Sequence, residues 1–296
     1  MNLRDGPQHG PTPPAAEAAR WRLRDVELDL ATPRIMAICN VTPDSFSDGG
    51  EHYSVALALK FAEAAARDGA SILDIGGEST RPGATPVHAD RELARVIPVI
   101  EAVRERVPQL LISIDTMKSV VAQAALDAGA HIINDVSAGR VDAKIFEVAF
   151  RTGAGLVLMH SRGGVRDMAS YAHADYGDDP VGAICDEVID RITLARAAGV
   201  AADQIVIDPG LGFSKTSAQS IALLRALHRF VDIGRPVLVG VSRKRFIGEI
   251  TGVTVPALRA TGSAMAHAVA VMRGARVVRT HDVAATREAL SIVAAL

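Results

Sequence analysis

One junction recurs along this chain: an alanine-rich stretch with helical character ends in a glycine, and a short apolar run follows at once. The glycine suits the left-handed position that ends a helix, and an unbroken apolar run suits a strand buried on both faces of a parallel sheet. Clear copies are RDGASILDIG (67–76), LDAGAHIIND (126–135), RTGAGLVLMH (151–160) and RGARVVRTHD (273–282), and a looser copy is AAGVAADQIVIDPG (197–210). The repetition predicts parallel strands that alternate with helices.

Three further apolar runs, at 34–39, 110–114 and 236–241, bring the predicted strands to eight, and a helical stretch follows each one. Eight such units predict an α/β fold of the (β/α)8 TIM-barrel type, as a single domain over residues 33–296, with its chemistry at the carboxyl ends of the strands. A doubly wound open sheet is the alternative, but no GxGxxG turn follows an early strand. Residues 1–32 are predicted to be an N-terminal extension, with a flexible tail and then a short strand or plug.

Composition supports a large core and argues against several classes of partner. Apolar residues make up 49% of the chain and aromatic residues only 4%, so the core must consist mainly of Ala, Val, Ile and Leu. A formal net charge of −2 gives no overall field that favours nucleic acid or an anionic membrane. The N-terminus has no hydrophobic signal core, and the two cysteines, Cys39 and Cys185, form no disulfide framework. We therefore expect a cytoplasmic protein that binds neither nucleic acid nor membrane.

Polar residues follow each predicted strand. A single Asp after a strand is more often a helix cap than a functional group. The eight strand ends of a barrel meet at one mouth, however, and helix caps alone do not require two arginines, a lysine and a histidine there. We therefore expect one shared site. The polar residues at these ends include Asn40, Asp74, Arg81, Asp115, Asn134, Asp135, His160, Asp208, Ser242, Arg243, Lys244, Arg279, His281 and Asp282.

This site has two chemical parts. The first suits a polyphosphate with Mg²⁺, because arginine forks bind phosphate and Mg²⁺ prefers hard oxygen ligands. Its members are Arg81, Arg279, His281 and the oxygen-rich segment NVTPDSFSDGG (40–50). The second suits a heterocycle with paired N–H donors, because its buried carboxylates have no evident arginine partner in the sequence. Its members are Asp115, Asn134, Asp208 and Lys244.

The segments at these strand ends resemble those of the dihydropteroate synthases, the folate-pathway enzymes targeted by sulfonamide drugs. They occur in the family's order and cover about residues 33–285, and the first two are long and specific. They are NVTPDSFSDGG (40–50), DIGGESTRPGATPV (74–87), SIDT (113–116), IINDVSAG (132–139), LMH (158–160), DPGLGFSKT (208–216), VSRK (241–244) and RTHDV (279–283). Ser161-Arg162 and Arg245 depart from the family's pattern, and we expect them beside the site rather than in it.

The resemblance implies a (β/α)8 homodimer that joins 4-aminobenzoate to 6-hydroxymethyl-7,8-dihydropterin diphosphate. The products are 7,8-dihydropteroate and diphosphate, and Mg²⁺ assists with Asn40 as its ligand. The implied diphosphate contacts are Thr80, Arg81, Arg279 and His281, and the implied pterin pocket is Asp115, Asn134, Asp208 and Lys244. The implied neighbours of the aminobenzoate are Pro82, Phe213 and Ser242, with Phe46 and Asp48 arriving as the first loop closes. The residues implied to act in catalysis are Phe46, Asp48, Arg81, Asp115, Asp208 and Lys244.

Two other functions fit the same resemblance. One is a catalytically silent relative that binds pterins, and the other is a pterin-dependent methyltransferase. An assay for dihydropteroate separates the first from a synthase. The second leaves the aromatic residue of the 40–50 loop and Lys244 without a clear use.

Overall fold

The computed structural model describes residues 19–42, 50–79 and 85–296, without the side chains of residues 50–54. The predicted flexible tail therefore lies outside the described residues. The strands are β1 (Arg20–Leu23), β2 (Val26–Asp29), β3 (Arg34–Asn40), β4 (Ile72–Gly76), β5 (Leu111–Asp115), β6 (Ile132–Asp135), β7 (Gly155–Met159), β8 (Ile205–Asp208), β9 (Leu238–Val239) and β10 (Val277–Thr280). The α-helices are α1 (Gly50–Asp68), α2 (Ala89–Arg106), α3 (Ser119–Asp127), α4 (Lys144–Thr152), α5 (Pro180–Ala197), α6 (Ser217–Arg225), α7 (His228–Val231), α8 (Arg245–Thr251), α9 (Ala260–Met272) and α10 (Val283–Ala294).

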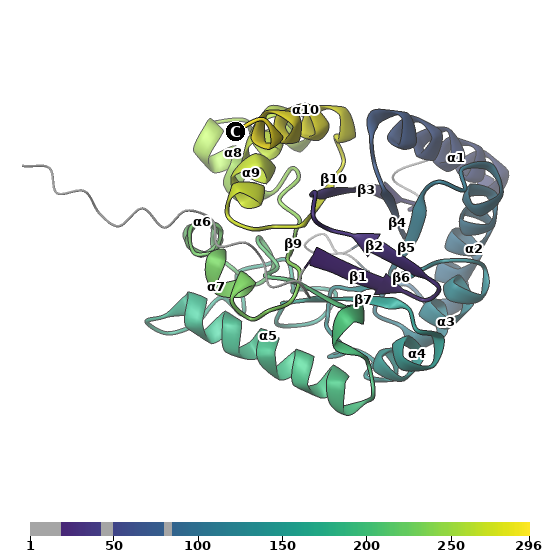
Figure 1. Ribbon diagram of the computed structural model, residues 1–296, viewed down its shortest axis with the longest axis horizontal. Coiled ribbons are helices and arrows are strands. Elements are labelled where there is room, and N and C mark those ends of the chain that lie inside the picture. The colour runs from purple at the N-terminus through teal and green to yellow at the C-terminus, as the bar shows by residue number, and fades with distance from the viewer. Residues whose placement is uncertain (1–18, 43–49, 80–84) are drawn as a thin grey trace, which may run out of the picture.

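Eight parallel strands form the central sheet, in the order β8-β7-β6-β5-β4-β3-β10-β9. An isolated bridge between Ile207 and Val237 joins the two ends of this order, so the sheet closes on itself. The helices surround the strands, as Figure 1 shows. Apolar side chains fill the layer between strands and helices, and they are mostly Ala, Val, Ile and Leu. The prediction of a (β/α)8 barrel is confirmed.

The seventh barrel strand is shorter than predicted. The apolar run at 236–241 predicts six residues, but β9 has only two, Leu238 and Val239. Pro236 has no N–H to donate to a strand ladder. Its carbonyl still accepts from the N–H of Ile207 at 3.0 Å, which holds the run beside β8. The neighbouring strands therefore fix the position of this segment with few ladder bonds of its own.

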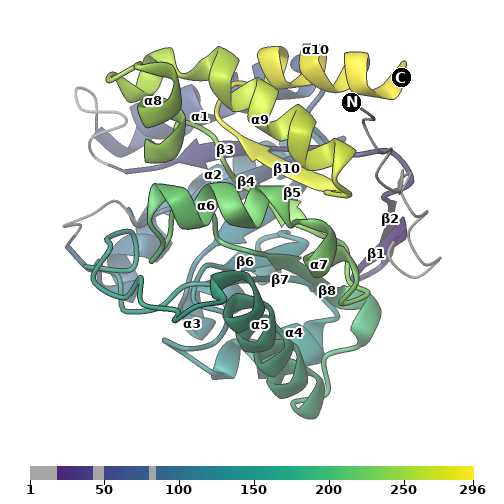
Figure 2. The same ribbon diagram turned by 90° about the vertical axis from the view of Figure 1, so that its left-hand side faces the viewer.

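A hairpin covers the amino-terminal end of the barrel. The sequence predicts one short strand or plug at 21–30, whereas β1 and β2 pair antiparallel around a turn in which Arg24 has φ +58°. Trp21 is fully buried and donates from Nε1 to the carbonyl of Gln204 at 2.7 Å. Figure 2 shows the hairpin at one end of the barrel. The apolar residues packed together there are Trp21, Leu23, Leu30, Met36, Ile72, Ile132, Val157, Val206, Leu238 and Val277.

We call this cluster the apolar floor of the barrel. The polar side chains of the site form the next layer above it. Residues two apart on a strand face the same side of a sheet. Each polar residue of the next layer follows a floor residue by two positions, as Asp208 follows Val206 and Arg279 follows Val277. Asp74 and Asn134 follow the floor residues of β4 and β6 in the same way. The strand period therefore turns these side chains into the barrel above its apolar floor.

No helix in the described part of the chain has both the length and the apolar character needed to cross a membrane.

Candidate active site

Arg279 on β10 lies between two aspartates from other strands of the barrel. Its Nε donates to Oδ2 of Asp74 and its Nη2 donates to Oδ2 of Asp115, each at 2.6 Å. The side-chain amide of Asn134 donates to the same oxygen of Asp74 at 3.0 Å. The expectation that Asp115 has no arginine partner is therefore wrong. The barrel is narrow enough for the long Arg279 side chain to reach across it, and so it joins the two chemical parts of the site.

Asp208 and Lys244 come together at the same mouth. Oδ1 of Asp208 accepts the N–H of Gly210 at 2.7 Å. Gly240 lies beside the other oxygen, because a Cβ added there would stand 3.9 Å from Oδ2 of Asp208 and 3.7 Å from Cβ of Arg279. Nζ of Lys244 lies 3.7 Å from the centre of the Phe213 ring, which is a cation–π contact. Asp115, Asp208, Lys244 and Arg279 thus converge on one region, as the sequence predicts.

Burial shifts the protonation of these groups towards neutrality. It raises the pKa of Asp115 to about 7, although the charge of Arg279 opposes the rise. It raises the pKa of Asp208 to about 6, opposed by the N–H of Gly210 and the charge of Lys244. It also lowers the pKa of Lys244 to about 7, with Asp208 opposing. Such perturbed groups are typical of functional sites.

Ser242 and His281 form a second pair at the mouth. Oγ of Ser242 lies 2.9 Å from Nδ1 of His281 and also accepts the backbone N–H of His281 at 3.1 Å. Burial and the nearby charge of Arg243 lower the pKa of His281 to about 3, so its imidazole is neutral. A Ser242 hydroxyl that donates to Nδ1 leaves the imidazole proton of His281 on Nε2, where it can be donated to a ligand. Arg243 itself is paired with Asp282 at 2.7 Å and is not directed at this pair.

An apolar wall borders the charged groups, and the sequence analysis did not identify it. Met117, Val136, Met159 and Met168 form a buried cluster against which Phe213 packs. Met117 and Val136 each stand two residues past a site residue, and Met159 ends β7. Their position after strand ends is the signal that could have revealed them.

A buried ion cluster lies beside Glu78 and Val87, on either side of the residues that the structure does not describe. Nζ of Lys118 contacts Oε2 of Glu78 at 2.9 Å and Oε2 of Glu92 at 2.6 Å. Oε1 of Glu78 accepts the N–H of Val87 at 2.6 Å, so the cluster joins Glu78 and Val87 to α2 and to the start of α3. This cluster could not be predicted from the sequence, because its members are 14 to 40 residues apart and Lys118 and Glu78 form the widest pair.

The remaining predicted residues differ in their placement. Asn40 ends β3 beside Gly76, at the mouth of the barrel. Asp135 turns away, because its carboxylate accepts from the N–H of Ser137 at 2.8 Å and closes the following turn. The predicted residues that lie outside the described part of the chain are Phe46, Asp48, Thr80, Arg81 and Pro82.

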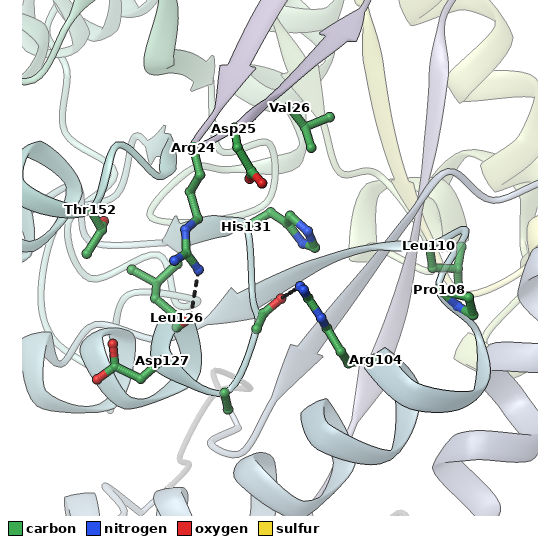
Figure 3. Close-up of a pocket in the computed structure, with 12 residues that line it drawn as sticks. Arg24, Asp25, Val26, Arg104, Pro108, Leu110, Leu126, Asp127, His131 and Thr152 are labelled. Carbon is green, nitrogen blue, oxygen red and sulfur yellow. Dashed lines mark hydrogen bonds between the residues drawn. The ribbon is translucent and has the colours of Figure 1, made fainter.

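A separate cavity of about 810 Å³ lies at the opposite end of the barrel, beside the β1–β2 turn. Figure 3 shows Arg24, Arg104 and His131 around it. Both arginines donate to main-chain carbonyls there, Arg24 to Leu126 at 2.7 Å and Arg104 to Gly129 at 3.2 Å. None of the predicted site residues lines this cavity, so the mouth described above remains the candidate active site.

Comparison with known proteins agrees with this geometry. The profile of the family described as pterin binding enzyme matches residues 36–281, which places the chain among the pterin-binding barrel enzymes. Dihydropteroate synthase from Escherichia coli (strain K12) is 42% identical over 268 residues, which are 90% of this chain and 93% of that protein. The chain belongs to the dihydropteroate synthase family.

Solved structures of the family superpose on the whole barrel. Xanthomonas albilineans dihydropteroate synthase with 4-aminobenzoic acid has a TM-score of 0.85 and 45% identity, covering 93% of this chain and 98% of that one. The same enzyme in complex with 7,8-dihydropteroate has a TM-score of 0.81 and 42% identity, with the same coverage of both chains.

Proposed function

We propose that this chain condenses 6-hydroxymethyl-7,8-dihydropterin diphosphate with 4-aminobenzoate to give 7,8-dihydropteroate and diphosphate. The observation that carries the proposal is the meeting of Asp115, Asn134, Asp208, Lys244 and Arg279 at one mouth of the barrel. One relative over 40% identical, the Xanthomonas albilineans enzyme, has structures with 4-aminobenzoic acid and with 7,8-dihydropteroate, which are a substrate and a product of this reaction.

The carboxylates account for recognition of the pterin. Ionised Asp208 accepts hydrogen bonds, and the amino-pyrimidinone edge of a pterin offers two N–H donors side by side. Oδ2 of Asp208 faces the interior at Gly240, whereas Oδ1 is occupied by Gly210. Lys244 supplies a donor to the pterin's acceptor atoms, and Phe213 fixes the lysine from behind. A ring without these N–H groups leaves a buried carboxylate unpaired, at a cost of about 1–3 kcal/mol.

Charge stabilisation accounts for the chemical step. The amine of 4-aminobenzoate is a weak nucleophile because its lone pair is delocalised into the ring. Departure of diphosphate therefore precedes attack, and the pterin's methylene carbon becomes cationic. Asp115 and Asp208 stabilise this cation, while Arg279 and the Nε2–H of His281 stabilise the departing diphosphate. The amine then attacks the methylene carbon, the C–N bond forms and one N–H proton passes to the departed diphosphate or to solvent, with Ser242 beside the aminobenzoate.

The residues present fit Mg²⁺ only together with the substrate. Asn40 offers one hard oxygen ligand at the mouth. The described residues contain no group of three His, Cys, Asp or Glu that could hold a metal alone. Mg²⁺ commonly keeps several waters and shares its coordination with substrate phosphates. Asn40 would hold the ion against the diphosphate, where the ion supplies positive charge to the leaving group.

A homodimer is the second part of the proposal. Exposed apolar side chains concentrate near the C-terminus, where α8 and α9 pack side by side. Met265 and Met272 are seven residues apart on α9 and thus share one exposed face. Ile250 on α8 and Leu258 just before α9 are also more than 60% exposed. An apolar face of this kind is typical of an interface with a second copy.

The compartment we propose is the cytoplasm, which suits two free, buried cysteines.

Incubation of the purified chain with pterin diphosphate and 4-aminobenzoate, with Mg²⁺ or with a chelator, tests the activity directly. We expect dihydropteroate only in the complete mixture with Mg²⁺. Pterin binding without product indicates a catalytically silent relative and contradicts the proposal. Equal turnover with the chelator contradicts the role of Mg²⁺ alone, and a monomeric mass by light scattering contradicts the homodimer alone.

A further inference from the structure

Lys215 is a buried lysine that the proposed reaction does not use directly. It lies between β8 and α6, and its side chain is among the largest that are fully buried. Its ammonium group has three acceptors: Nδ1 of His160 at 2.8 Å, the carbonyl of Phe213 at 2.9 Å and the carbonyl of His160 at 3.3 Å. Three acceptors match the three N–H donors of a lysine ammonium. A charged Lys215 is therefore fully hydrogen-bonded although its side chain is buried away from solvent.

A series of polar contacts continues from Lys215 through His160 to Glu187. Nε2 of His160 lies 3.1 Å from Oε2 of Glu187 on α5. Burial and the charge of Lys215 lower the pKa of His160 to about 4, so the ring is neutral, accepts from Lys215 and donates to Glu187. Burial opposes ionisation of Glu187, but hydrogen bonds from His160 and Arg162 lower its pKa to about 2. Arg140 also contacts Glu187, at 3.0 Å. A neutral imidazole thus bridges a buried cation and an anchored carboxylate.

The same lysine holds the 208–215 segment against His160, which follows the end of β7. Gly210 has φ +67°, and a Cβ there would stand 1.9 Å from the carbonyl oxygen of His160 and 3.4 Å from Nζ of Lys215. Only a glycine fits at position 210, because the backbone there lies so close to the carbonyl of His160. At the other end of the segment, Lys215 donates to the carbonyl of Phe213. This segment carries both Asp208 and Phe213, one from the carboxylates of the site and one from its apolar wall.

We propose that Lys215 is a positioning residue of the pterin subsite: its buried side chain fixes the 208–215 segment and places positive charge beside Gly210, whose N–H binds the carboxyl group of Asp208. The inference rests on the proposed function, because it assigns Asp208 to pterin recognition. It also gives Arg162, which departs from the family's pattern, a place in the support of Glu187, with its guanidinium 4.0 Å from the centre of the Tyr176 ring.

The effect of Lys215 on Asp208 follows from the charged groups around these two residues. Burial raises the pKa of Asp208, and the N–H of Gly210 with the charges of Lys244, Lys215 and Arg279 oppose that rise. Burial lowers the pKa of Lys215 well below its usual range, while Asp208 and Glu187 oppose the fall and Lys244 and Arg162 add to it. Removing the charge of Lys215 takes one cation away from Asp208. The carboxyl group of Asp208 must then titrate at higher pH.

Two variants separate the charge from the anchoring contacts. Lys215→Gln keeps an amide donor at the end of the side chain and removes the charge, whereas Lys215→Met removes both. Lys60→Gln, on the exposed face of α1, is the matched control. In ligand-free protein, ¹³C NMR of labelled aspartate carboxyls follows the titration of Asp208, with Asp208→Asn to assign the signal. Calorimetry with 6-hydroxymethylpterin, which has no phosphate to titrate, gives the affinity at pH 8.

We expect the Asp208 midpoint to move to higher pH in both Lys215 variants and to stay unchanged in Lys60→Gln. We expect the pterin affinity at pH 8 to fall about tenfold in Lys215→Met, because the segment loses its charged anchor, and to fall less in Lys215→Gln. If Lys215→Met does not fold, Lys215→Gln alone decides the outcome.

An unmoved Asp208 midpoint in the variants overturns the electrostatic role, and an unchanged affinity at pH 8 in both variants overturns the positioning role. A lower melting temperature with neither change shows that Lys215 is merely structural. If the wild-type chain binds no pterin, the proposed function fails, whereas the Asp208 titration still tests the charge of Lys215.

Discussion

Replacing Asp208 with asparagine should remove pterin binding and leave the fold intact. The change keeps the size of the side chain and the oxygen that accepts the N–H of Gly210 at 2.7 Å. It removes the negative charge on the oxygen that faces Gly240 and Arg279, where the pterin's N–H donors would lie. A hydrogen bond to a charged group contributes about 1.5–3 kcal/mol. We therefore expect pterin affinity to fall between about tenfold and a hundredfold for each of the two bonds.

The stability of the same variant follows from two opposing effects. Asp208 has its pKa raised to about 6 by burial, so its ionisation at pH 7 costs the folded state about 3 kcal/mol relative to the unfolded chain. Asparagine removes this cost at neutral pH, and the gain disappears as the pH falls below the usual range of an aspartate. Against this, Lys215 and Lys244 lose a counter-charge. We expect a net change in the free energy of unfolding within about 2 kcal/mol.

Calorimetric titration with 6-hydroxymethylpterin and thermal unfolding, run on the same preparation, measure both quantities. Asp203→Asn is the control, because it makes the same change on an exposed side chain paired with Arg22 at the floor end of the barrel. Near-normal affinity in Asp208→Asn would remove this residue from the site. Loss of affinity together with a large fall in melting temperature would show that Asp208 acts through the fold.

Three further predictions concern neighbouring groups. Arg279→Met leaves Asp74 and Asp115 without their cation and should lower the free energy of unfolding by about 3 kcal/mol in urea titration. Arg243→Met is the control: its pair with Asp282 is more exposed, so it should lower the free energy of unfolding by only about 1 kcal/mol. Equal losses in the two variants would contradict the buried network. Pterin affinity should be highest near pH 7, because it should fall at lower pH as Asp115 and then Asp208 take up protons and fall above about pH 7 as Lys244 loses its proton. A flat profile from pH 5 to 9 would argue against these roles. Phe46→Ala should raise the KM for 4-aminobenzoate more than it weakens pterin diphosphate binding, and an equal loss in both would count against a cover over the aminobenzoate.

The barrel and the location of its site could be predicted because both depend on local patterns. A glycine before an apolar run marks five of the eight βα units, and apolar runs alone mark the other three, so the number and order of the strands follow from the sequence. The strand period of two residues then turns Asp208 and Arg279 into the barrel above an apolar floor. Strand ends were predictable where a polar residue interrupts the run, as at Asp115.

Side-chain pairing could not be predicted because it depends on distances across the barrel. Arg279 and Asp74 are 205 residues apart in sequence, and Arg279 binds carboxylates as readily as phosphate. The sequence therefore supports a phosphate role for Arg279 and contains no sign of its aspartate partners. Lys215 was missed for a similar reason, since its acceptors include two carbonyl groups that carry no sequence signal.

A crystal structure of this chain with 6-hydroxymethylpterin bound tests the central claim most directly. We predict that the heterocycle lies against Phe213 and Met159, with its amino-pyrimidinone edge on Asp208 and Lys244 within reach of its acceptors. Density for the pterin at another place, such as the cavity between Arg24 and Arg104 at the opposite end of the barrel, would contradict the assignment of the site.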